Sequence, residues 1–369
     1  MGGTTKRKES LSHIRAVSCM AVVVLHTFFA YFGFVGKDTV SYKATVLIRN
    51  LMFWAVPCFV MVTGALLLDP AREIGYKKVF RKYIPRMVVA LVAFSLVFLG
   101  VDLGFGFTAW SKDTIPSFLK SLLTGQGQWS HMWYLYTMIG LYLILPVLHA
   151  FVRSSDRRGM SALALILLVF LSVLPLLESV CEIDVGIYLP MITVYPLYLV
   201  LGRVFGEERG CGERDRGERG RVDGGAAASS EAGTETSGKR RLGSFILLVL
   251  VFALGMSICT LLYLNKDITK LRELVTDYSF PLTVVGAVGV FGLIHALGGR
   301  NRVLCFIDKH AFGIYLIHMI PLKILAVKKP FNPYDIGVWF IFAVAVGVFL
   351  VSLLVTYLLR LIPIVRKVL

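Results

Sequence analysis

A succession of apolar runs, each about twenty residues long, is the feature of this sequence that most restricts its fold. About 20 residues of α-helix cross the hydrocarbon core of a bilayer, and a backbone in lipid must satisfy its own hydrogen bonds. Composition agrees, because 56% of the 369 residues are hydrophobic and only 17% are charged, whereas soluble domains carry about 25% charged residues. The sequence therefore predicts an all-α polytopic membrane protein with about ten transmembrane helices. We expect these helices at 14–34, 45–68, 87–105, 131–152, 161–177, 187–205, 244–264, 280–297, 311–326 and 336–359.

The segment between the sixth and seventh apolar runs differs from the rest of the chain. It is rich in Gly, Arg, Glu, Ser and Ala and has little to bury, so it is predicted to be a disordered linker. Its arginines could also touch anionic lipid or nucleic acid, but a solvated linker is the preferred interpretation. The predicted domains are a cytoplasmic tail at 1–13, helices one to six at 14–206, the cytoplasmic linker at 207–242, helices seven to ten at 243–360 and a cytoplasmic tail at 361–369.

The distribution of basic residues predicts the orientation of the chain. Most Lys and Arg fall in the N-terminal tail, in the loops after even-numbered helices and in the C-terminal tail, which places both termini in the cytoplasm by the positive-inside rule. The net charge of +16 is therefore assigned to topology, and no nucleic-acid partner is expected. The six cysteines are scattered without a CxxC pair, so we expect no disulfide framework and no metal site. The first apolar run is too long for a cleavable signal peptide and should remain as an anchor.

The first apolar run contains two side chains that are costly in a membrane, Arg15 and His26. Eleven residues separate them, so on a helix they lie about 20° apart on one face and about 16 Å apart along the axis. Such groups usually face a protein interior or a wet cavity, which favours a reaction or transport cavity. An imidazole in an apolar cavity is neutral near pH 7 and can accept a proton from a hydroxyl, and arginine suits a phosphate or carboxylate. The alternative is that Arg15 snorkels to the surface and His26 is a hydrogen-bonded core residue.

A basic segment precedes the third helix and contains Lys78, Arg81, Lys82 and Arg86. Topology explains much of this charge, because a cytoplasmic loop should be basic. The density of cations also allows a phosphate-rich cofactor to bind there. Both interpretations stay open from these residues alone.

Aromatic residues and a further histidine form two other candidate groups. Trp133, Tyr134 and Tyr136 follow His131 at the start of the fourth helix, where an aromatic belt is the default interpretation and a stacking platform for a sugar is the alternative. Tyr315 and His318 are three residues apart on the ninth helix. Core packing is the preferred interpretation of this second group, and catalysis is the alternative.

Several of these stretches together resemble one known family. Arg15-x10-His26 resembles the signature of the membrane acyltransferase family 3, integral-membrane O-acyltransferases that modify bacterial surface polysaccharides. Lys78 stands where that family usually has arginine, which puts bidentate phosphate recognition there in doubt. Four further stretches resemble family motifs in the family's order, namely Val56–Gly64, Lys78-x-x-Arg81-x-x-x-Pro85, Trp133–Pro146 and Phe312–His318.

The resemblance implies an O-acetyltransferase whose acyl donor, most simply acetyl-CoA, arrives from the cytoplasm. It implies that His26 is the catalytic base or a transient acyl carrier, and that Arg15 helps to position His26 or to hold the donor. The acceptor would be a hydroxyl of a lipid-linked or cell-surface glycan, reached directly or through a partner acyl-acceptor protein. The location would be the inner membrane of a bacterium. The expected donor-binding residues are Lys78, Arg81, Lys82 and Arg86, and the expected acceptor-binding residues are Trp133, Tyr134, Tyr136, Tyr315 and His318.

Two other functions compete with the acyltransferase interpretation. A transporter or flippase for a glycan or a small anion could use the Arg15–His26 face as a binding track. The chain could also be a non-catalytic membrane subunit of a polysaccharide export complex. Turnover of acyl-CoA by the purified protein would separate the enzyme from both.

Overall fold

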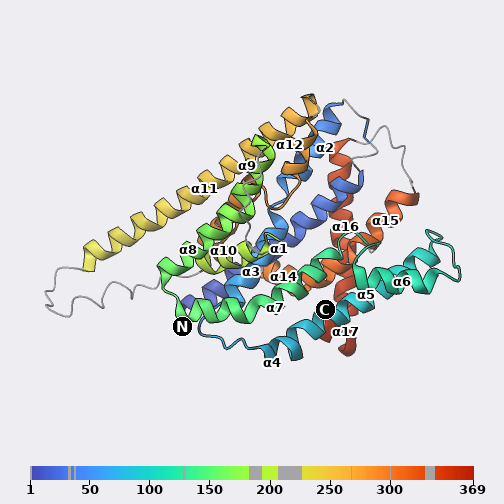
Figure 1. Cartoon of the computed structure of the whole chain (residues 1–369), viewed down its shortest axis with the longest axis horizontal. Coiled ribbons are helices and arrows are strands. Elements are labelled where there is room, and N and C mark those ends of the chain that lie inside the picture. The colour runs from blue at the N-terminus through green and yellow to red at the C-terminus, as the bar shows by residue number, and fades with distance from the viewer. Residues whose placement is uncertain are drawn as a thin grey trace. The chain divides into compact units, whose positions relative to one another are not determined.

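The computed structural model describes residues 2–31, 35–36, 39–127, 129–182, 193–206, 227–266, 268–299, 301–328 and 337–369, and every regular element in these residues is a helix. The chain divides into two compact units. Unit 1 comprises Met1–Ser18, Phe53–Leu66 and Arg157–Cys305, and unit 2 comprises Cys19–Met52, Leu67–Asp156 and Phe306–Leu369. The first helix, α1 (Gly2–Tyr31), contributes its first part to unit 1 and its second part to unit 2 (Figure 1).

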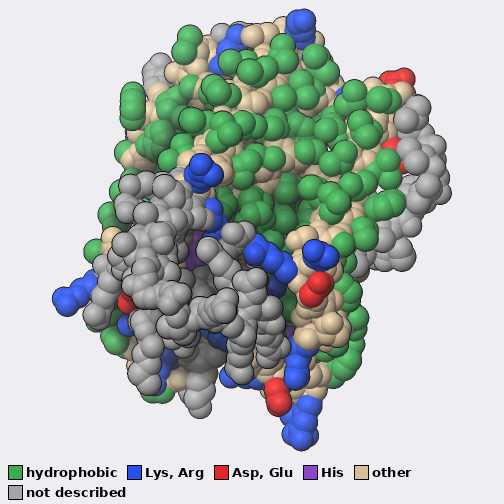
Figure 2. All heavy atoms as spheres, turned by 90° about the vertical axis from the view of Figure 1, so that its left-hand side faces the viewer, with side chains coloured by type: hydrophobic (Ala, Val, Ile, Leu, Met, Phe, Trp, Pro, Cys, Tyr) green, Lys and Arg blue, Asp and Glu red, His purple; other side chains and the backbone are tan. Residues whose placement is uncertain are grey.

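The described helices confirm the polytopic membrane fold. Seven helical segments are long and apolar enough to cross a membrane, and a bent pair of helices makes an eighth. The two remaining predicted spans, 187–205 and 280–297, correspond to the shorter apolar helices Tyr195–Phe205 and Pro281–Leu297. The first of these spans is described only from residue 193. Figure 2 shows hydrophobic side chains over much of one face, as expected for helices that contact lipid. The seven segments are Glu9–Tyr31, Val40–Leu67, Tyr76–Gly104, Trp133–Ser154, Arg157–Cys181, Arg240–Lys266 and Val338–Leu359.

Unit 1 contains a group of helices from the middle of the chain together with one from its first third. In this unit α11 packs against α12 and α13, and α10 packs against α8 and α13. A π-helical segment, Val169–Val173, joins α8 to α9. The helices are α3 (Ala55–Leu67), α8 (Arg157–Leu168), α9 (Leu174–Cys181), α10 (Tyr195–Phe205), α11 (Ala227–Lys266), α12 (Thr269–Val275) and α13 (Pro281–Leu297).

Two glycines let α3 and α10 approach each other more closely than any other residue would allow. A Cβ atom added to Gly64 would lie 2.0 Å from the carbonyl oxygen of Leu199. A Cβ atom added to Gly202 would lie 1.9 Å from the carbonyl oxygen of Met61. Small residues at such contacts are the usual means of close helix packing in membranes, where the solvent supplies no hydrophobic drive between helices.

The helix α11 differs from the prediction for the linker. The linker is expected to extend from 207 to 242, but α11 already begins at Ala227, while residues 207–226 lie outside the described part. The stretch from 227 to 242 contains Ala, Glu, Lys and Arg, which have high helix propensity, although its hydrophobicity is low. A polar stretch with little apolar surface to bury can therefore still be helical when it continues into a membrane helix, as in α11.

Unit 2 contains the elements that surround the candidate site. Here α5 packs against α6, α7 and α17, and α16 packs against α2 and α15. The segment between the third and fourth predicted spans contains the helix α6. The helices are α2 (Val40–Leu51), α4 (Tyr76–Lys78), α5 (Ile84–Gly104), α6 (Thr114–Thr124), α7 (Trp133–Ser154), α14 (Arg302–Ile317), α15 (Met319–Lys328), α16 (Val338–Leu359) and α17 (Pro363–Val368).

The ninth predicted span is broken rather than straight. α14 and α15 meet at His318 with a bend of 41°. Pro321 follows the break, and a proline in a helix lacks an N–H and clashes with the carbonyl four residues earlier, which here belongs to Ile317. Irregular backbone at membrane depth is tolerated only where it is buried in protein or lines a cavity, so the break itself marks a candidate site.

Candidate active site

Three histidines from distant parts of the sequence meet in unit 2, and we call them the imidazole cluster. His26 lies on α1, His131 directly precedes α7, and His318 lies at the break between α14 and α15. The Nδ1 atom of His26 is 2.8 Å from the Nε2 atom of His318, and the two rings are stacked with centroids 5.0 Å apart. The ring of His131 stands edge-on to both, with centroids 6.5 Å from His26 and 5.4 Å from His318. The structure thus brings together two predicted site residues that are 292 residues apart.

The hydrogen bonds of His318 determine where the protons lie when both rings are neutral. Its Nδ1 atom is 3.2 Å from the main-chain carbonyl of Ile314. A carbonyl only accepts, so Nδ1 of His318 carries the hydrogen and Nε2 is left as an acceptor. His26 must then donate from Nδ1 to that acceptor, which leaves Nε2 of His26 unprotonated. A main-chain carbonyl therefore selects, through His318, the tautomer of His26 that can act as a base.

His131 completes the cluster as a buried neutral group. Its Nε2 atom donates to the carbonyl of Leu316 at 3.3 Å, while Nδ1 is buried and has no hydrogen-bond partner among the described residues. Burial, together with the proximity of His318 and His26, holds the pKa of His131 well below its usual value of 6.5. No group of three or more His, Cys, Asp or Glu side chains in the described residues is arranged to hold a metal ion.

A cavity of about 930 Å³, which we call the His26 cavity, opens beside the cluster. His26 lines it, together with Asp102 of α5, Trp129 and Lys323 of α15. The Lys323 ammonium pairs with Oδ1 of Asp102 at 2.5 Å, and the indole N–H of Trp129 donates to Oδ2 of Asp102 at 3.0 Å. Lys323 also lies 4.4 Å from the centre of the Trp129 ring. The charges of Asp102 and Lys323 cancel, so the described lining of the cavity next to His26 carries no net charge.

The aromatic residues predicted to bind the acceptor lie around the cluster but do not line the His26 cavity, within the described residues. The hydroxyl of Tyr315 donates to the main-chain carbonyl of His131, and the ring of Tyr315 packs against His131 at 5.6 Å. Tyr134 packs against Tyr315 with centroids 5.5 Å apart, and Trp133 contacts Tyr134 at 6.0 Å. The hydroxyl of Tyr136 donates to the carbonyl of Leu122 on α6 at 2.7 Å. Tyr315 thus fixes the position of His131, and acceptor binding by these four residues stays a prediction.

The residues predicted to bind the donor lie away from the imidazole cluster. Lys78, Arg81, Lys82 and Arg86 are all exposed, on α4, on the π-helical segment Val79–Tyr83 and at the start of α5. Arg86 donates to the main-chain oxygens of residues 368 and 369, both at 3.3 Å, and Lys78 donates to the carbonyl of residue 73 at 3.1 Å. Arg15 belongs to unit 1 and precedes His26 by three turns of α1. None of these five side chains is among the described residues that line the His26 cavity.

Sequence reasoning missed four residues of this site: His131 as a member of the cluster, and the group formed by Asp102, Trp129 and Lys323. Asp102 and Lys323 each interrupt an otherwise apolar run. Ionisable residues in membrane segments usually pair with one another or line a cavity, so their pairing was a possible inference. Trp129 carried no such signal, because a tryptophan near the end of a span is ordinary in an interfacial belt.

Comparison with known proteins agrees with the chemistry of this site. No curated protein and no solved structure matches the chain. The family model described as an acyltransferase domain matches residues 8–206 and 224–359, which include all three histidines of the imidazole cluster. The match interrupts at residues 207–223, inside the predicted linker. Because the match extends over nearly the whole sequence, the chain belongs to the acyltransferase 3 family.

Proposed function

We propose that this membrane acyltransferase moves an acyl group, most simply acetyl, from cytoplasmic acyl-CoA to a hydroxyl of a lipid-linked or cell-surface glycan. The observation that carries the proposal is the geometry of His26. Its Nδ1 donates to His318, so its Nε2 carries the lone pair, and the His26 side chain lines the His26 cavity. An imidazole held in this tautomer is the group that an acyl transfer to an alcohol requires.

The reaction follows from the proton positions. The Nε2 atom of His26 takes the proton of the acceptor hydroxyl as its oxygen attacks the thioester carbonyl. The carbon–sulfur bond then breaks, and the proton on His26 passes to the departing thiolate of CoA, so the enzyme returns to its starting state. The same lone pair could instead attack the thioester carbonyl and expel CoA as its thiolate, so that Nε2 carries the acyl group. The acceptor hydroxyl would then attack this acyl group and break its bond to Nε2, and the hydroxyl proton would pass to the thiolate. Both routes need the hydrogen bond from Nδ1 to His318, which supports the positive charge that develops on the ring.

The donor is proposed to approach from the basic side of the membrane. Lys78, Arg81 and Lys82 are exposed and form no ion pair with an acidic side chain in the described part of the chain. Exposed cations attract phosphates such as those of CoA. With both termini cytoplasmic, this basic segment faces the compartment that contains acyl-CoA, in agreement with a location in the inner membrane of a bacterium.

The proposal is tested by radiolabel transfer from acetyl-CoA in membranes that contain a glycan-bearing lipid fraction. We expect label in the glycan with the wild type and none above background with His26→Ala. His149→Gln is the matched control, because His149 is a buried histidine whose Nε2 bonds a main-chain carbonyl at 3.2 Å. Equal labelling by the wild type and His26→Ala would contradict the proposal. Proton-coupled uptake of a glycan or anion into vesicles, without acyl transfer, would support the transporter instead.

A further inference from the structure

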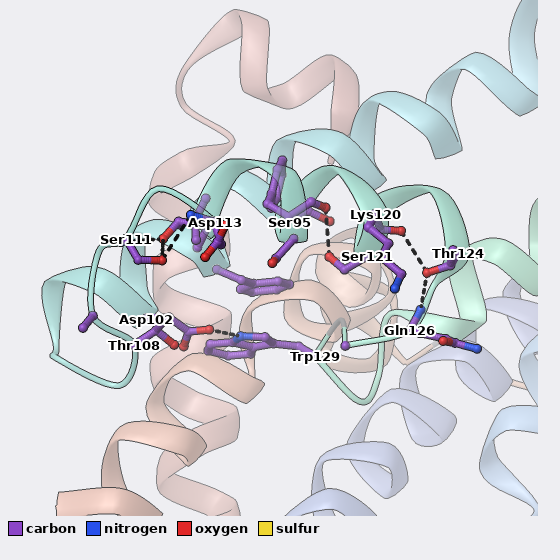
Figure 3. A pocket seen from close by; sticks show the side chains of 17 residues that line it. Ser95, Asp102, Thr108, Ser111, Asp113, Lys120, Ser121, Thr124, Gln126 and Trp129 are labelled. Carbon is purple, nitrogen blue, oxygen red and sulfur yellow. Dashed lines mark hydrogen bonds between the residues drawn. The ribbon is translucent and has the colours of Figure 1, made fainter.

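A second hollow, of about 510 Å³, lies beside α5 and α6 in unit 2 (Figure 3), and we call it the α6 hollow. Seven hydroxyl side chains and the amide of Gln126 are among its lining residues, together with the aromatic rings of Phe98, Phe118 and Trp129. Figure 3 shows Ser121, Thr124 and Gln126 at one end and Ser111 and Asp113 at the other. A polar space of this size beside a membrane helix holds either water or a polar ligand.

Two hydroxyls of the α6 hollow, those of Thr124 and Ser121, donate their hydrogens to the backbone. Thr124 donates its hydroxyl hydrogen to the carbonyl of Lys120 at 2.8 Å, and Ser121 donates to the carbonyl of Phe118 at 2.9 Å. Thr114 accepts the main-chain N–H of Ser111 at 2.9 Å. A hydroxyl whose hydrogen is engaged with the backbone still offers lone pairs to a ligand. A ligand that carries hydroxyl donors matches these acceptors.

The charges at the α6 hollow favour an uncharged ligand. Asp102 lines the hollow, and its charge is matched by Lys323. Asp113 and Lys120 line it as well and have opposite signs. No excess of positive charge is available for a phosphate among these described residues. A neutral polyhydroxylated chain satisfies both the hydrogen bonds and the charge.

Trp129 forms the wall between this hollow and the His26 cavity. Phe98, which lines only the α6 hollow, stacks on one face of the indole with centroids 4.3 Å apart and an angle of 10°. Lys323, which lines only the His26 cavity, lies over the indole at 4.4 Å and so occupies the other face. Asp102 and Gly127 line both spaces together with Trp129. Since both faces of the indole are covered, its role is that of a fixed partition and not of a stacking platform for a sugar.

We propose that the α6 hollow binds the sugar residues of the acceptor, as a neutral polyhydroxylated chain, and that Trp129 controls which hydroxyl passes into the His26 cavity. Gly127 adds no side chain to the shared wall, and its φ of 75° is a conformation that other residues rarely adopt. The hydroxyl passes at this point. The inference rests on the proposed acyl transfer to a glycan and assigns its acceptor to one place in the fold.

The test blocks the hollow without touching the imidazole cluster. Ser117→Cys places a thiol in the lining of the hollow, and Leu119→Cys is its matched control. Leu119 is 51% exposed on the same helix and is two residues away, about 200° around the axis. Both variants are labelled with a bulky biotin maleimide, and the labelled wild type controls for native cysteines such as the exposed Cys181. Two rates are measured: acyl transfer to the glycan-bearing lipid fraction, and release of CoA without any glycan.

We expect the adduct of Ser117→Cys to lose at least tenfold in transfer to glycan while its release of CoA stays within twofold of the wild type. The adduct of Leu119→Cys should keep both rates within twofold. Equal transfer by the two adducts would overturn the inference. An equal loss of transfer and of CoA release would overturn it as well, because the hollow would then act on the catalytic centre and not on the acceptor.

A second measurement does not depend on catalysis. The rate of maleimide labelling at Ser117→Cys is followed with and without oligosaccharides released by mild acid from the envelope of the cells that carry the protein. Protection at this position, without protection at Leu119→Cys, supports the inference even if the wild type neither transfers acyl groups nor releases CoA. That inactivity would refute the proposed function alone. Unprotected labelling at both positions would refute the acceptor site.

Discussion

The imidazole cluster and the basic segment are two parts of the predicted site, and the structure treats them in opposite ways. His131 and His318 are held by bonds to main-chain carbonyls, and His26 is held by its bond to His318. Lys78, Arg81 and Lys82 extend from the surface on α4 and the adjoining π-helical segment. Proton transfer requires a donor and an acceptor positioned within a few tenths of an ångström, whereas attraction of a phosphate needs only charge nearby. Under the proposed function, the difference teaches that burial separates the residues that carry out the chemistry from the residues that attract the donor.

The largest expected effect comes from His26. In His26→Ala the base and its hydrogen bond to His318 are both lost, so we expect the turnover number to fall about 10³-fold or more. Transfer from radiolabelled acetyl-CoA measures the effect, and expression level with the elution profile in detergent shows whether the fold is kept. If His26→Ala is well folded and keeps half of the wild-type rate, His26 is not the base.

His318 should show a smaller effect that differs between two substitutions. In His318→Ala nothing accepts the Nδ1 hydrogen of His26, so the base changes between tautomers and we expect a loss of about 10- to 100-fold in turnover number. In His318→Gln the amide oxygen can accept that hydrogen, which should restore part of the rate. The KM for acyl-CoA should stay unchanged in both variants. Equal loss in both, or a change confined to KM, would show that His318 acts only by filling space.

Arg81 and Lys82 should affect binding of the donor and not its chemistry. Replacing both with Ala removes exposed charge, so we expect the KM for acyl-CoA to rise several-fold, by less at high salt, with the turnover number unchanged. Arg81→Lys with Lys82 intact is the control that keeps the charge. A fall in turnover number at saturating acyl-CoA would show that these cations reach the reacting atoms. The basic segment would then take part in the chemistry and not only in binding of the donor.

The burial of His131 predicts how stability depends on pH. The folded-state pKa of His131 lies well below 6.5. Below about pH 6.5, His131 is therefore protonated in the unfolded chain but stays neutral in the folded chain. This contribution to stability is complete above pH 6.5 and decreases on acidification, by at most about 1.4 kcal/mol per pH unit. Thermal unfolding in detergent between pH 7.5 and 5 should therefore show a steeper loss for the wild type than for His131→Gln. Parallel curves would show that His131 is not buried as a neutral group.

The smallest effect is expected where charge is plentiful but no site is proposed. Residues 207–223 contain several arginines and lie outside the family match. Their deletion should leave turnover number and KM within twofold of the wild type. A rise in the KM for acyl-CoA as large as that caused by the double substitution at Arg81 and Lys82 would show that basic charge attracts the donor irrespective of its position.

Much of the fold followed from the length and composition of the apolar runs, because a bilayer accepts only helices of a given span. The bend at His318 was also present in the sequence as Pro321. The helix α6 lies between two predicted spans, where the length of the apolar runs gives no indication of structure. The start of α11 was not predicted. The stretch from 227 to 242 has few apolar residues, which indicated a disordered linker, but the structure has a helix there.

The candidate site was only half predictable, for a reason of distance. His26 can be recognised from the sequence alone, because an ionisable residue in a membrane segment is costly and usually has a functional role. Its bond to His318 joins residues 292 positions apart, and no local pattern encodes such a contact. The same holds for Asp102 and Lys323, which are 221 positions apart. Local signals indicated which residues are unusual, and only the fold showed which of them act together.

The group that sets the tautomer of His26 is the main-chain carbonyl of Ile314, which accepts both the N–H of residue 318 at 3.0 Å and the Nδ1–H of His318 at 3.2 Å. A backbone atom is present whatever side chain the position carries. The side chain at position 314 can therefore vary among related proteins without a change in the tautomer of His26, and a search for invariant side chains would overlook this position. A substitution at position 314 leaves the main-chain oxygen in place, and only a change in the backbone of α14 would move it.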